Sequence, residues 1–231
     1  MKKIRHVFFD LDRTLWDFES NSHATLKELF SEFKLTEKLG VSDDDFILEY
    51  KRINELFWDD YRKGNIKKEY LRYGRFETAL NHFGYSNKNM ASEFGDLYVS
   101  RSPHKPGLVD GTIEVLQYLR EKYQLHIITN GFEEVQHIKI KSSGLTSFFK
   151  NVITSESAGA QKPSRVIFDH AENLTGAVAA NSVMIGDHFE ADVIGAVDSN
   201  WKAVLYEPEK PKMQDDRFIH IHHLKELLEI L

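Results

Sequence analysis

Short apolar runs that stop abruptly at polar residues recur along the chain, and this pattern constrains the fold more than any other feature of the sequence. They occupy positions 4–9, 125–129, 152–154, 182–185 and 203–206. Most of the intervals between them carry a helical pattern, as in Ile113, Leu116 and Leu119. Short buried strands that alternate with amphipathic helices are typical of parallel sheets. The sequence therefore predicts an α/β fold with a doubly wound, mostly parallel, Rossmann-like sheet.

The stretch between the first and second of these runs follows a different pattern. Leu26, Leu29 and Phe30 recur at the spacing of one helix face, as do Phe46 and Tyr50. No strand pattern interrupts the stretch, and two of the five prolines lie at its far boundary, where a helix cannot continue. We therefore predict an all-helical domain at 17–103, inserted into an α/β core made of 1–16 and 104–231.

The composition excludes several classes of function. The net charge of −6 argues against a protein that grips the backbone of a nucleic-acid polymer. The lack of cysteine excludes disulfides, thiolate metal sites and a cysteine nucleophile, but it leaves room for a hard metal ion held by oxygen atoms. No apolar run reaches the ~20 residues of a membrane helix, and Asp10 comes too early for a signal peptide. We therefore expect a cytoplasmic protein without a membrane partner.

Two carboxylates, Asp10 and Asp12, follow the first apolar run. If the extended geometry continues past the run, both side chains point the same way. Like charges at this distance repel, so a cation or a shared proton would be needed to hold both. The structural alternative is a turn or a helix cap, for which aspartate is equally suited.

Two smaller clusters come later in the chain. Thr129-Asn130-Gly131 ends the second run and combines a hydroxyl with backbone N–H groups that can bind an anion. A plain helix N-cap explains the same residues. Lys162 precedes Pro163, a residue suited to the first turn of a helix. A lysine there is either a solvated surface charge or a point charge for a phosphate or carboxylate.

Acidic residues crowd the end of the fourth run, in Gly186-Asp187 and then at Asp192. Helix capping accounts for one or two of them, whereas metal binding would account for the whole group. All four clusters lie at or near the carboxyl ends of predicted strands, the edge where open α/β sheets bind ligands. Acids, a hydroxyl, backbone donors and a lysine at one edge predict a phosphate site with a divalent cation.

The order of these clusters resembles the four motifs of the haloacid dehalogenase superfamily. The residues that carry the resemblance are, in order, Asp10-x-Asp12-x-Thr14, Thr129, Lys162 and Gly186-Asp187-x-x-x-x-Asp192. The resemblance spans the chain, because the helical insertion is similar to the helical cap of that family. It implies a hydrolase with Mg²⁺ as cofactor. Asp12 favours phosphoryl transfer over dehalogenation, since a halide leaving group needs no proton donor.

The resemblance also implies roles for the acidic residues. Asp10 would attack phosphorus and form an aspartyl-phosphate intermediate. Asp12 would protonate the leaving alkoxide and then deprotonate the attacking water. The Asp10 carboxylate, the backbone carbonyl of Asp12 and Asp187 would hold Mg²⁺, and Asp192 would support the site through water or Lys162.

The other motif residues would bind the phosphoryl group. Thr129 and the N–H groups of Asn130 and Gly131 would contact its oxygens. Lys162 would neutralise charge on the phosphate and on Asp10. The substrate would be a small phosphorylated metabolite.

One further pattern narrows the resemblance within the superfamily. The segment 129–145 looks similar to house-cleaning 5′-nucleotidases, which dephosphorylate nucleoside monophosphates, and to acylneuraminate-9-phosphatases. We favour a nucleoside-monophosphate 5′-nucleotidase. The alternatives are a sugar-phosphate, phosphoglycolate or acylneuraminate phosphatase, and a phosphomutase similar to β-phosphoglucomutase. A phospho-accepting regulatory domain is the non-enzymatic alternative.

Several residues outside the motifs are predicted to be structural. Gln136, Lys139 and Lys141 are expected on the exposed surface of a helix. Arg13 replaces the glycine that is commonest in this motif, and it reaches either substrate or solvent. His188 is expected to be a structural residue beside the fourth motif. Most aromatic residues of the insertion are expected to build its own core. The insertion is rich in them, and they include Phe57, Trp58, Tyr61, Tyr70, Tyr73 and Phe76.

Overall fold

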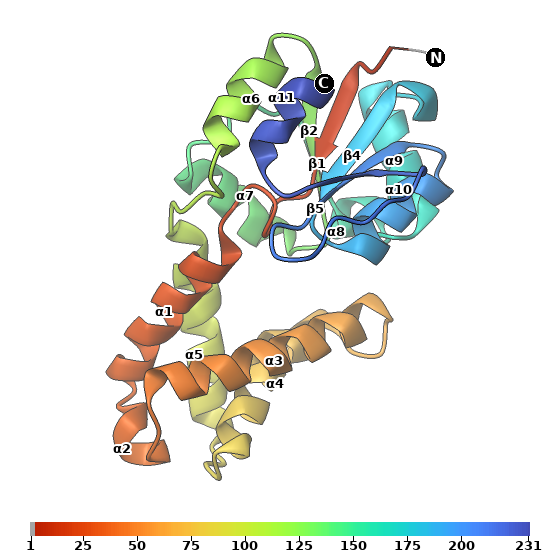
Figure 1. Cartoon of the computed structure of the whole chain (residues 1–231). Coiled ribbons are helices and arrows are strands. Elements are labelled where there is room, and N and C mark those ends of the chain that lie inside the picture. Colours follow the sequence, from red (N-terminus) through yellow and green to blue (C-terminus); the bar gives the residue numbers. More distant parts are fainter. Residues whose placement is uncertain (1–2) are drawn as a thin grey trace. The chain divides into compact units, whose positions relative to one another are not determined.

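The structure, a computed structural model, describes residues 3–231. It forms two compact units, one made of the chain up to Phe18 together with Pro106–Leu231, and the other made of Glu19–Lys105 (Figure 1). The sequence places the insertion at 17–103, so each boundary differs by two residues. None of the described helices is long and apolar enough to cross a membrane.

The α/β unit is built on one parallel sheet. Its strands are β1 (His6–Phe9), β2 (Gln124–Thr129), β3 (Asn151–Thr154), β4 (Ser182–Gly186), β5 (Lys202–Tyr206) and β6 (Ile219–Ile221). Its helices are α6 (Thr112–Arg120), α7 (Glu133–Ser142), α8 (Ser155–Ala158), α9 (Arg165–Thr175), α10 (Gly195–Asp198) and α11 (Leu227–Ile230). The strand order is β3-β2-β1-β4-β5-β6, and every pairing is parallel. The predicted doubly wound fold is therefore confirmed.

Successive side chains of each strand point to opposite faces of the sheet, so the core of this unit has two layers. Val7 and Phe9 pack in a cluster with residues of α6, α7 and α11, whereas Phe8 packs in a second cluster with residues of α9 and α10. Figure 1 shows these helices on the two faces of the sheet. A strand that is buried on both faces has a continuous run of apolar residues, which is why five of the strands could be recognised in the sequence.

The sixth strand, β6, was not predicted from the sequence. It is three residues long and alternates Ile219, His220 and Ile221, so it lacks a continuous apolar run. It pairs only with β5, at one edge of the sheet. An edge strand buries less side-chain surface than a central one, and its sequence signal is correspondingly weak.

The second unit, Glu19–Lys105, is built from helices joined by short loops, and it contains no strand. Its helices are α1 (Phe18–Glu32), α2 (Leu35–Leu39), α3 (Asp43–Arg62), α4 (Lys68–His82) and α5 (Lys88–Arg101). Ser42 starts α3 by accepting a hydrogen bond from the backbone N–H of Asp45 at 3.1 Å, and Asn87 caps α5 in the same way. Leu26, Leu29 and Phe30, which form the predicted apolar face of a helix, lie in one buried cluster with residues of α3, α4 and α5.

Most aromatic residues of this unit build its core, as predicted: the buried cluster contains Phe30, Phe46, Tyr50, Phe76, Phe94 and Tyr98, and Phe33, Phe57, Phe83 and Tyr85 pack against it. The six residues singled out from the sequence contribute less than the others. Of the six, only Phe76 lies fully in the core. Tyr70 and Tyr73 are 40% and 38% exposed. The remaining three are half-buried, and Phe57 packs against the core cluster. Ring contacts join Phe57 to Tyr70, with 5.6 Å between the centroids, Trp58 to Tyr61, and Tyr70 to Tyr73.

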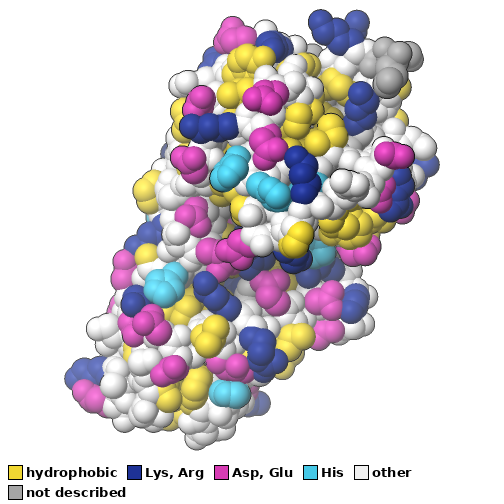
Figure 2. All heavy atoms as spheres, in the orientation of Figure 1, with side chains coloured by type: hydrophobic (Ala, Val, Ile, Leu, Met, Phe, Trp, Pro, Cys, Tyr) yellow, Lys and Arg dark blue, Asp and Glu magenta, His cyan; other side chains and the backbone are white. Residues whose placement is uncertain are grey.

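Charges of both signs are distributed over the surface. Figure 2 shows acidic and basic side chains intermixed on the viewed face, with hydrophobic side chains scattered between them. The viewed face is therefore not dominated by charge of one sign.

A buried histidine makes the stability of the α/β unit dependent on pH. His126 of β2 is fully buried, and its ring lies 4.6 Å from that of Phe8 and 5.4 Å from that of His6. Burial, together with the charge of His6, lowers the pKa of His126 from 6.5 to about 4. Between pH 6.5 and pH 4, His126 binds more protons in the unfolded chain than in the folded chain. The contribution of this histidine to the free energy of unfolding is therefore complete above pH 6.5 and declines as the pH falls towards 4.

We expect this group to lower the free energy of unfolding by about 2 kcal/mol between pH 7 and pH 5. Urea unfolding at both pH values measures the difference. His126→Phe removes the titrating ring and should shrink the decline, whereas His104→Phe, at an exposed position, should leave it unchanged. An identical decline in wild type and His126→Phe would contradict the assignment.

Candidate active site

Three of the predicted clusters meet because their strands are neighbours. β1 lies between β2 and β4, and Phe9 stands opposite Ile127 on one side and Ile185 on the other. Asp10, Thr129 and Asp187 therefore emerge at the same edge of the sheet. The chain adds β2 and β3 on one side of β1 and β4 to β6 on the other, and such a switch point is where open sheets bind ligands.

Lys162 is a buried cation at the centre of the site. Its ammonium nitrogen lies 2.6 Å from Asp10 Oδ1 and 2.6 Å from Asp192 Oδ1, and it donates to the backbone oxygen of Ile128 at 2.7 Å. The contacts with Asp10 and Ile128 are hydrogen bonds, and the contact with Asp192 is an ion pair. With 2% of its surface exposed, Lys162 is not the solvated surface charge of the structural alternative.

Asn130 holds the loop that delivers this lysine. Its amide nitrogen donates to the backbone oxygen of Lys162 at 3.0 Å, and its amide oxygen accepts from the backbone N–H of Lys162 at 2.8 Å. The side chain of Asn130 is thus committed to the protein, so any ligand of this residue would have to be bound through its backbone. The sequence does not reveal this role, because the two residues are 32 positions apart.

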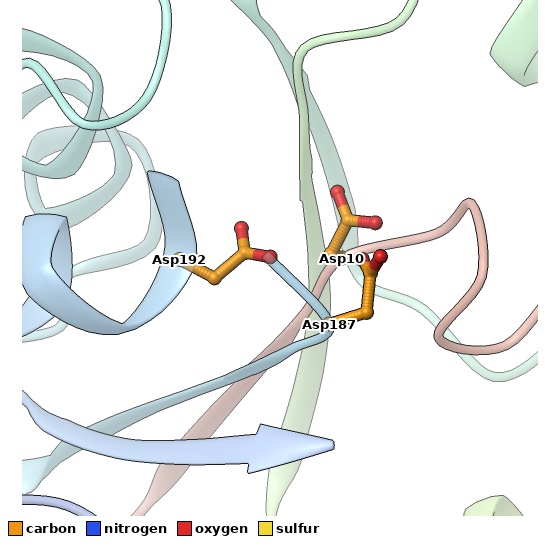
Figure 3. Close-up of side chains that lie close together, drawn as sticks. All are labelled: Asp10, Asp187 and Asp192. Carbon is orange, nitrogen blue, oxygen red and sulfur yellow. The ribbon is translucent and has the colours of Figure 1, made fainter. Parts of the chain in front are cut away.

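Three carboxylates converge beside Lys162. Asp10, Asp187 and Asp192 each present an oxygen within 4.8 Å of the others, and Figure 3 shows the three side chains lying close together, with Asp192 extending from its helical turn toward the other two. The hydroxyl of Thr14 donates to Asp187 Oδ1 at 3.4 Å. Asp10 comes from a segment separate from Asp187 and Asp192, so its proximity to them depends on the pairing of β1 with β4 rather than on local spacing.

Asp192 is held by contacts to both of its oxygens. Oδ1 pairs with Lys162, and Oδ2 accepts from the backbone N–H of His188 at 3.0 Å. Gly186 allows this close approach, because a Cβ there would lie 2.2 Å from Asp192 Oδ2. Asp192 belongs to a π-helical turn at Phe189–Ile194, which the sequence pattern did not distinguish from an ordinary helix.

The electrostatics of the site show an excess of negative charge. Burial raises the pKa of Asp10 to about 7; the ammonium of Lys162 opposes this shift, and the charges of Asp192 and Asp12 add to it. Burial and the charge of Asp10 raise the pKa of Asp187 well above its ordinary value. Burial alone would lower the pKa of Lys162, but the charges of Asp10 and Asp192 hold it above its usual range.

The donor set fits a divalent cation. If all three carboxyl groups are ionised, one ammonium leaves two negative charges in excess, and a divalent cation would compensate them. Carboxylate oxygens are the ligands that Mg²⁺ prefers. Since both oxygens of Asp192 already have partners, Asp10 and Asp187 are the side chains suited to direct contact. Asp192 then fixes Lys162 in place.

The hydroxyl of Thr129 is oriented as a donor. Its oxygen accepts from the backbone N–H of Gly131 at 3.1 Å and from the side-chain amide of Gln136 at 2.6 Å. A hydroxyl has two acceptor positions and one proton. Both acceptor positions are occupied, so the proton is directed to another group, and an anionic oxygen is a suitable acceptor.

The prediction that Gln136 and Lys139 lie on a helix surface is wrong. Both are buried, with 0% and 6% of their surface exposed. Lys139 Nζ lies 2.6 Å from Asp12 Oδ1, and Gln136 Nε2 donates to Asp12 Oδ2 at 2.8 Å. The buried Ile140, four positions after Gln136, marks the same face of α7 and was the available signal. Lys141 is exposed, as predicted.

Two residues beside the motifs have structural contacts. The guanidinium of Arg13 lies 4.7 Å from the centre of the Phe18 ring, and its charge opposes the rise in the pKa of Asp187. Nδ1 of His188 accepts from the backbone N–H of Ala191 at 3.2 Å and caps the π-helical turn. Arg13 has a φ of 63°, an uncommon conformation that tightens the loop after Asp12.

The whole chain is similar to known hydrolases. A family model described as haloacid dehalogenase-like hydrolase matches residues 4–200. The hydrolase YfnB of Bacillus subtilis is 28% identical, over 100% of this chain and 97% of its own. A crystal structure of YfnB, described as bound to magnesium and as revealing interdomain movement, matches with a TM-score of 0.89 at 27% identity, over 100% of this chain and 99% of the other.

Two relatives of known activity also match most of the chain. The pyrimidine 5′-nucleotidase YjjG of Escherichia coli is 30% identical, over 84% of this chain and 81% of its own. The N-acylneuraminate-9-phosphatase of Homo sapiens is 28% identical, over 89% and 83%. These matches confirm the family that the motifs predicted, and they include members of the predicted subgroup, a 5′-nucleotidase and an acylneuraminate-9-phosphatase. The chain belongs to the family of haloacid dehalogenase-like hydrolases.

Proposed function

We propose that the protein is a Mg²⁺-dependent phosphomonoester hydrolase that works through an aspartyl-phosphate on Asp10. The observation that carries the proposal is the pairing of Asp10 with Lys162 at 2.6 Å, beside a second carboxylate, Asp187, at the carboxyl edge of the sheet. One oxygen of Asp10 is held by Lys162, which leaves the other to act as nucleophile. Buried charge this close to a reacting group stabilises a phosphoryl transition state more strongly than it would in water.

The first chemical step forms the intermediate. An oxygen of Asp10 attacks phosphorus, and the bond between phosphorus and the ester oxygen breaks. Asp12 in its protonated form gives its proton to the departing alkoxide, which leaves as an alcohol. The Thr129 hydroxyl and the N–H groups of Asn130 and Gly131 bind the phosphoryl oxygens, whose charge Lys162 balances.

The second step releases phosphate. Water attacks phosphorus, Asp12 takes a proton from it, and the bond to Asp10 breaks, so that inorganic phosphate leaves and both carboxyl groups return to their starting forms. The residues suited to hold Mg²⁺ are Asp10, Asp187 and the backbone carbonyl of Asp12. When bound, the ion supplies positive charge that stabilises the transferring phosphoryl group.

The substrate is proposed to be a nucleoside 5′-monophosphate. The similarity to pyrimidine 5′-nucleotidases of Escherichia coli and Streptococcus pneumoniae supports this choice. The helical unit, Glu19–Lys105, is proposed to act as a cap that excludes water, and it carries exposed aromatic rings, Tyr70 and Tyr73, of the kind that stack on bases. A sugar-phosphate or acylneuraminate phosphatase is the second candidate, favoured by the similarity to the human enzyme.

A screen over nucleoside monophosphates, sugar phosphates and phosphoglycolate tests the proposal. We expect Mg²⁺-dependent phosphate release, highest with a pyrimidine nucleoside monophosphate. Higher turnover of sugar phosphates would favour the second candidate. A need for a sugar bisphosphate would indicate a phosphomutase, and a stoichiometric burst without turnover would indicate a regulatory domain.

Removal of the metal provides a further prediction. EDTA should abolish activity and added Mg²⁺ should restore it. The melting temperature should rise with Mg²⁺ concentration, because an ion that binds only the folded state stabilises it. Full activity in chelator, or a melting temperature that does not respond to Mg²⁺, would contradict the metal assignment.

A further inference from the structure

We propose that Gln136 and Lys139 are positioning residues, which hold the Asp12 carboxylate and the Thr129 hydroxyl in the orientation that phosphoryl transfer requires. This inference rests on the proposed function, because it assigns Asp12 to proton transfer. We refer to Gln136 and Lys139 as the α7 clamp. Both residues project from α7, the helix that follows β2.

Asp12 depends on this clamp for its orientation. It lies beyond the end of β1, in a tight loop where Arg13 adopts a left-handed conformation, and its side chain is 27% exposed. Each carboxylate oxygen has one partner from the clamp, at 2.6 Å from Lys139 and 2.8 Å from Gln136. Two contacts on two oxygens fix both the position and the rotation of the carboxylate.

Lys139 is itself held rigidly. Its ammonium lies 4.4 Å from the centre of the buried Trp16 ring and 5.9 Å from that of Phe18. A cation over an aromatic face is attracted by the ring, and burial leaves the side chain few alternative rotamers. Lys139 therefore presents a fixed charge rather than a mobile one.

Gln136 couples Asp12 to the phosphate-binding loop. Its amide nitrogen has two protons, of which one goes to Asp12 and the other to Thr129 Oγ1. Both acceptors need a donor, so the orientation of the amide is determined by its partners. The side chain of Gln136 thus orients both the Asp12 carboxylate, which transfers protons, and the Thr129 hydroxyl, which binds phosphate.

Gly131 makes room for this contact. A Cβ at position 131 would lie 2.0 Å from the amide nitrogen of Gln136. Any residue larger than glycine would displace that amide and break its bonds to Asp12 and Thr129. Gly131 therefore serves the clamp as well as offering its backbone N–H to a phosphate.

Loss of the clamp should slow the chemistry without abolishing binding. We expect Lys139→Met and Gln136→Met each to lower kcat about 10- to 100-fold, a range typical of misplaced catalytic groups, with KM changed much less. Gly131→Ala should resemble Gln136→Met. Lys141→Met on the same helix serves as the matched control, because Lys141 is exposed and outside the clamp.

Dependence on the leaving group separates positioning from a merely structural role. Asp12 protonates the leaving oxygen, so its misplacement should matter most for an alkyl phosphate and least for p-nitrophenyl phosphate, whose leaving group needs little protonation. We therefore expect Lys139→Met to lower kcat/KM for the best alkyl phosphate of the screen at least about 5-fold more than for p-nitrophenyl phosphate. Equal losses on both substrates would overturn the inference.

A double-mutant cycle provides the second test. In an Asp12→Asn background, Lys139→Met should cost less than about 3-fold in kcat, because the group that it positions is already lost. Fully additive losses would overturn the inference. If Lys139→Met does not fold, Gln136→Met is subjected to the same cycle and substrate pair. Near-normal activity of Asp12→Asn itself would instead contradict the proposed function.

Discussion

Asp10→Asn is expected to lower kcat by at least about 10⁴-fold, because the amide oxygen of asparagine is a poor nucleophile for phosphorus. The change preserves the shape of the side chain and an oxygen that can accept a hydrogen bond from Lys162. The pKa of Asp10 is raised to about 7 by burial, so its charge is costly in the folded state. Without Mg²⁺ we therefore expect a melting temperature that is unchanged or higher than that of wild type.

Initial rates on p-nitrophenyl phosphate with Mg²⁺, together with thermal unfolding, test both parts of this prediction. Asp216→Asn is the control, since Asp216 is exposed and distant in sequence from the four motifs. The variant should also lose much of the stabilisation that Mg²⁺ confers on wild type, because it lacks one of the proposed ligands. A stable Asp10→Asn protein with near-normal kcat would exclude the covalent mechanism.

Lys162→Met should damage both activity and stability. The methionine side chain has a similar length but no charge, so it leaves Asp10 and Asp192 without the cation that contacts both at 2.6 Å. Removing one partner of a buried ion pair costs about 3–5 kcal/mol of folding free energy. The loss of charge beside the phosphoryl group should lower kcat by about 10²- to 10³-fold.

Urea unfolding and steady-state kinetics measure these two effects. Lys150→Met, at an exposed position, removes a lysine without touching the site and should change neither quantity appreciably. Added Mg²⁺ should restore part of the lost stability, because a divalent cation compensates some of the negative charge that loses its partner when Lys162 is replaced. Wild-type stability of Lys162→Met would contradict the central role of this lysine.

Much of the fold is visible in the sequence. Strands buried on both faces appear as continuous apolar runs, so five of the six were predicted, and only the short edge strand at Ile219–Ile221 was not. The helical unit was recognised from the spacing of residues such as Leu26 and Phe46. Exposure was harder to judge, because Ile113 matches an apolar helical face and yet is 38% exposed. Periodicity reports a pattern, whereas burial depends on what packs against it.

The site was only partly accessible to sequence reasoning. Acidic and lysine clusters at strand ends pointed to Asp10 and Lys162, and the strand order brings these two residues together. The contacts of Asn130, Gln136 and Lys139 were not predicted, since each links segments far apart in the chain. A polar residue on a helix is usually solvated, and only its three-dimensional partners reveal that it is buried.

The most direct test of the account is to locate the phosphoryl group on the enzyme. Asp12→Asn should slow release of phosphate from the intermediate more than its formation from p-nitrophenyl phosphate, whose leaving group needs no acid. Acid-quenched samples of this variant with Mg²⁺ and p-nitrophenyl phosphate can be digested and examined by mass spectrometry. We predict a hydroxylamine-labile phosphoryl group on Asp10. Release of p-nitrophenolate with Asp10 unmodified, or with the phosphoryl group on another residue, would contradict the proposed mechanism.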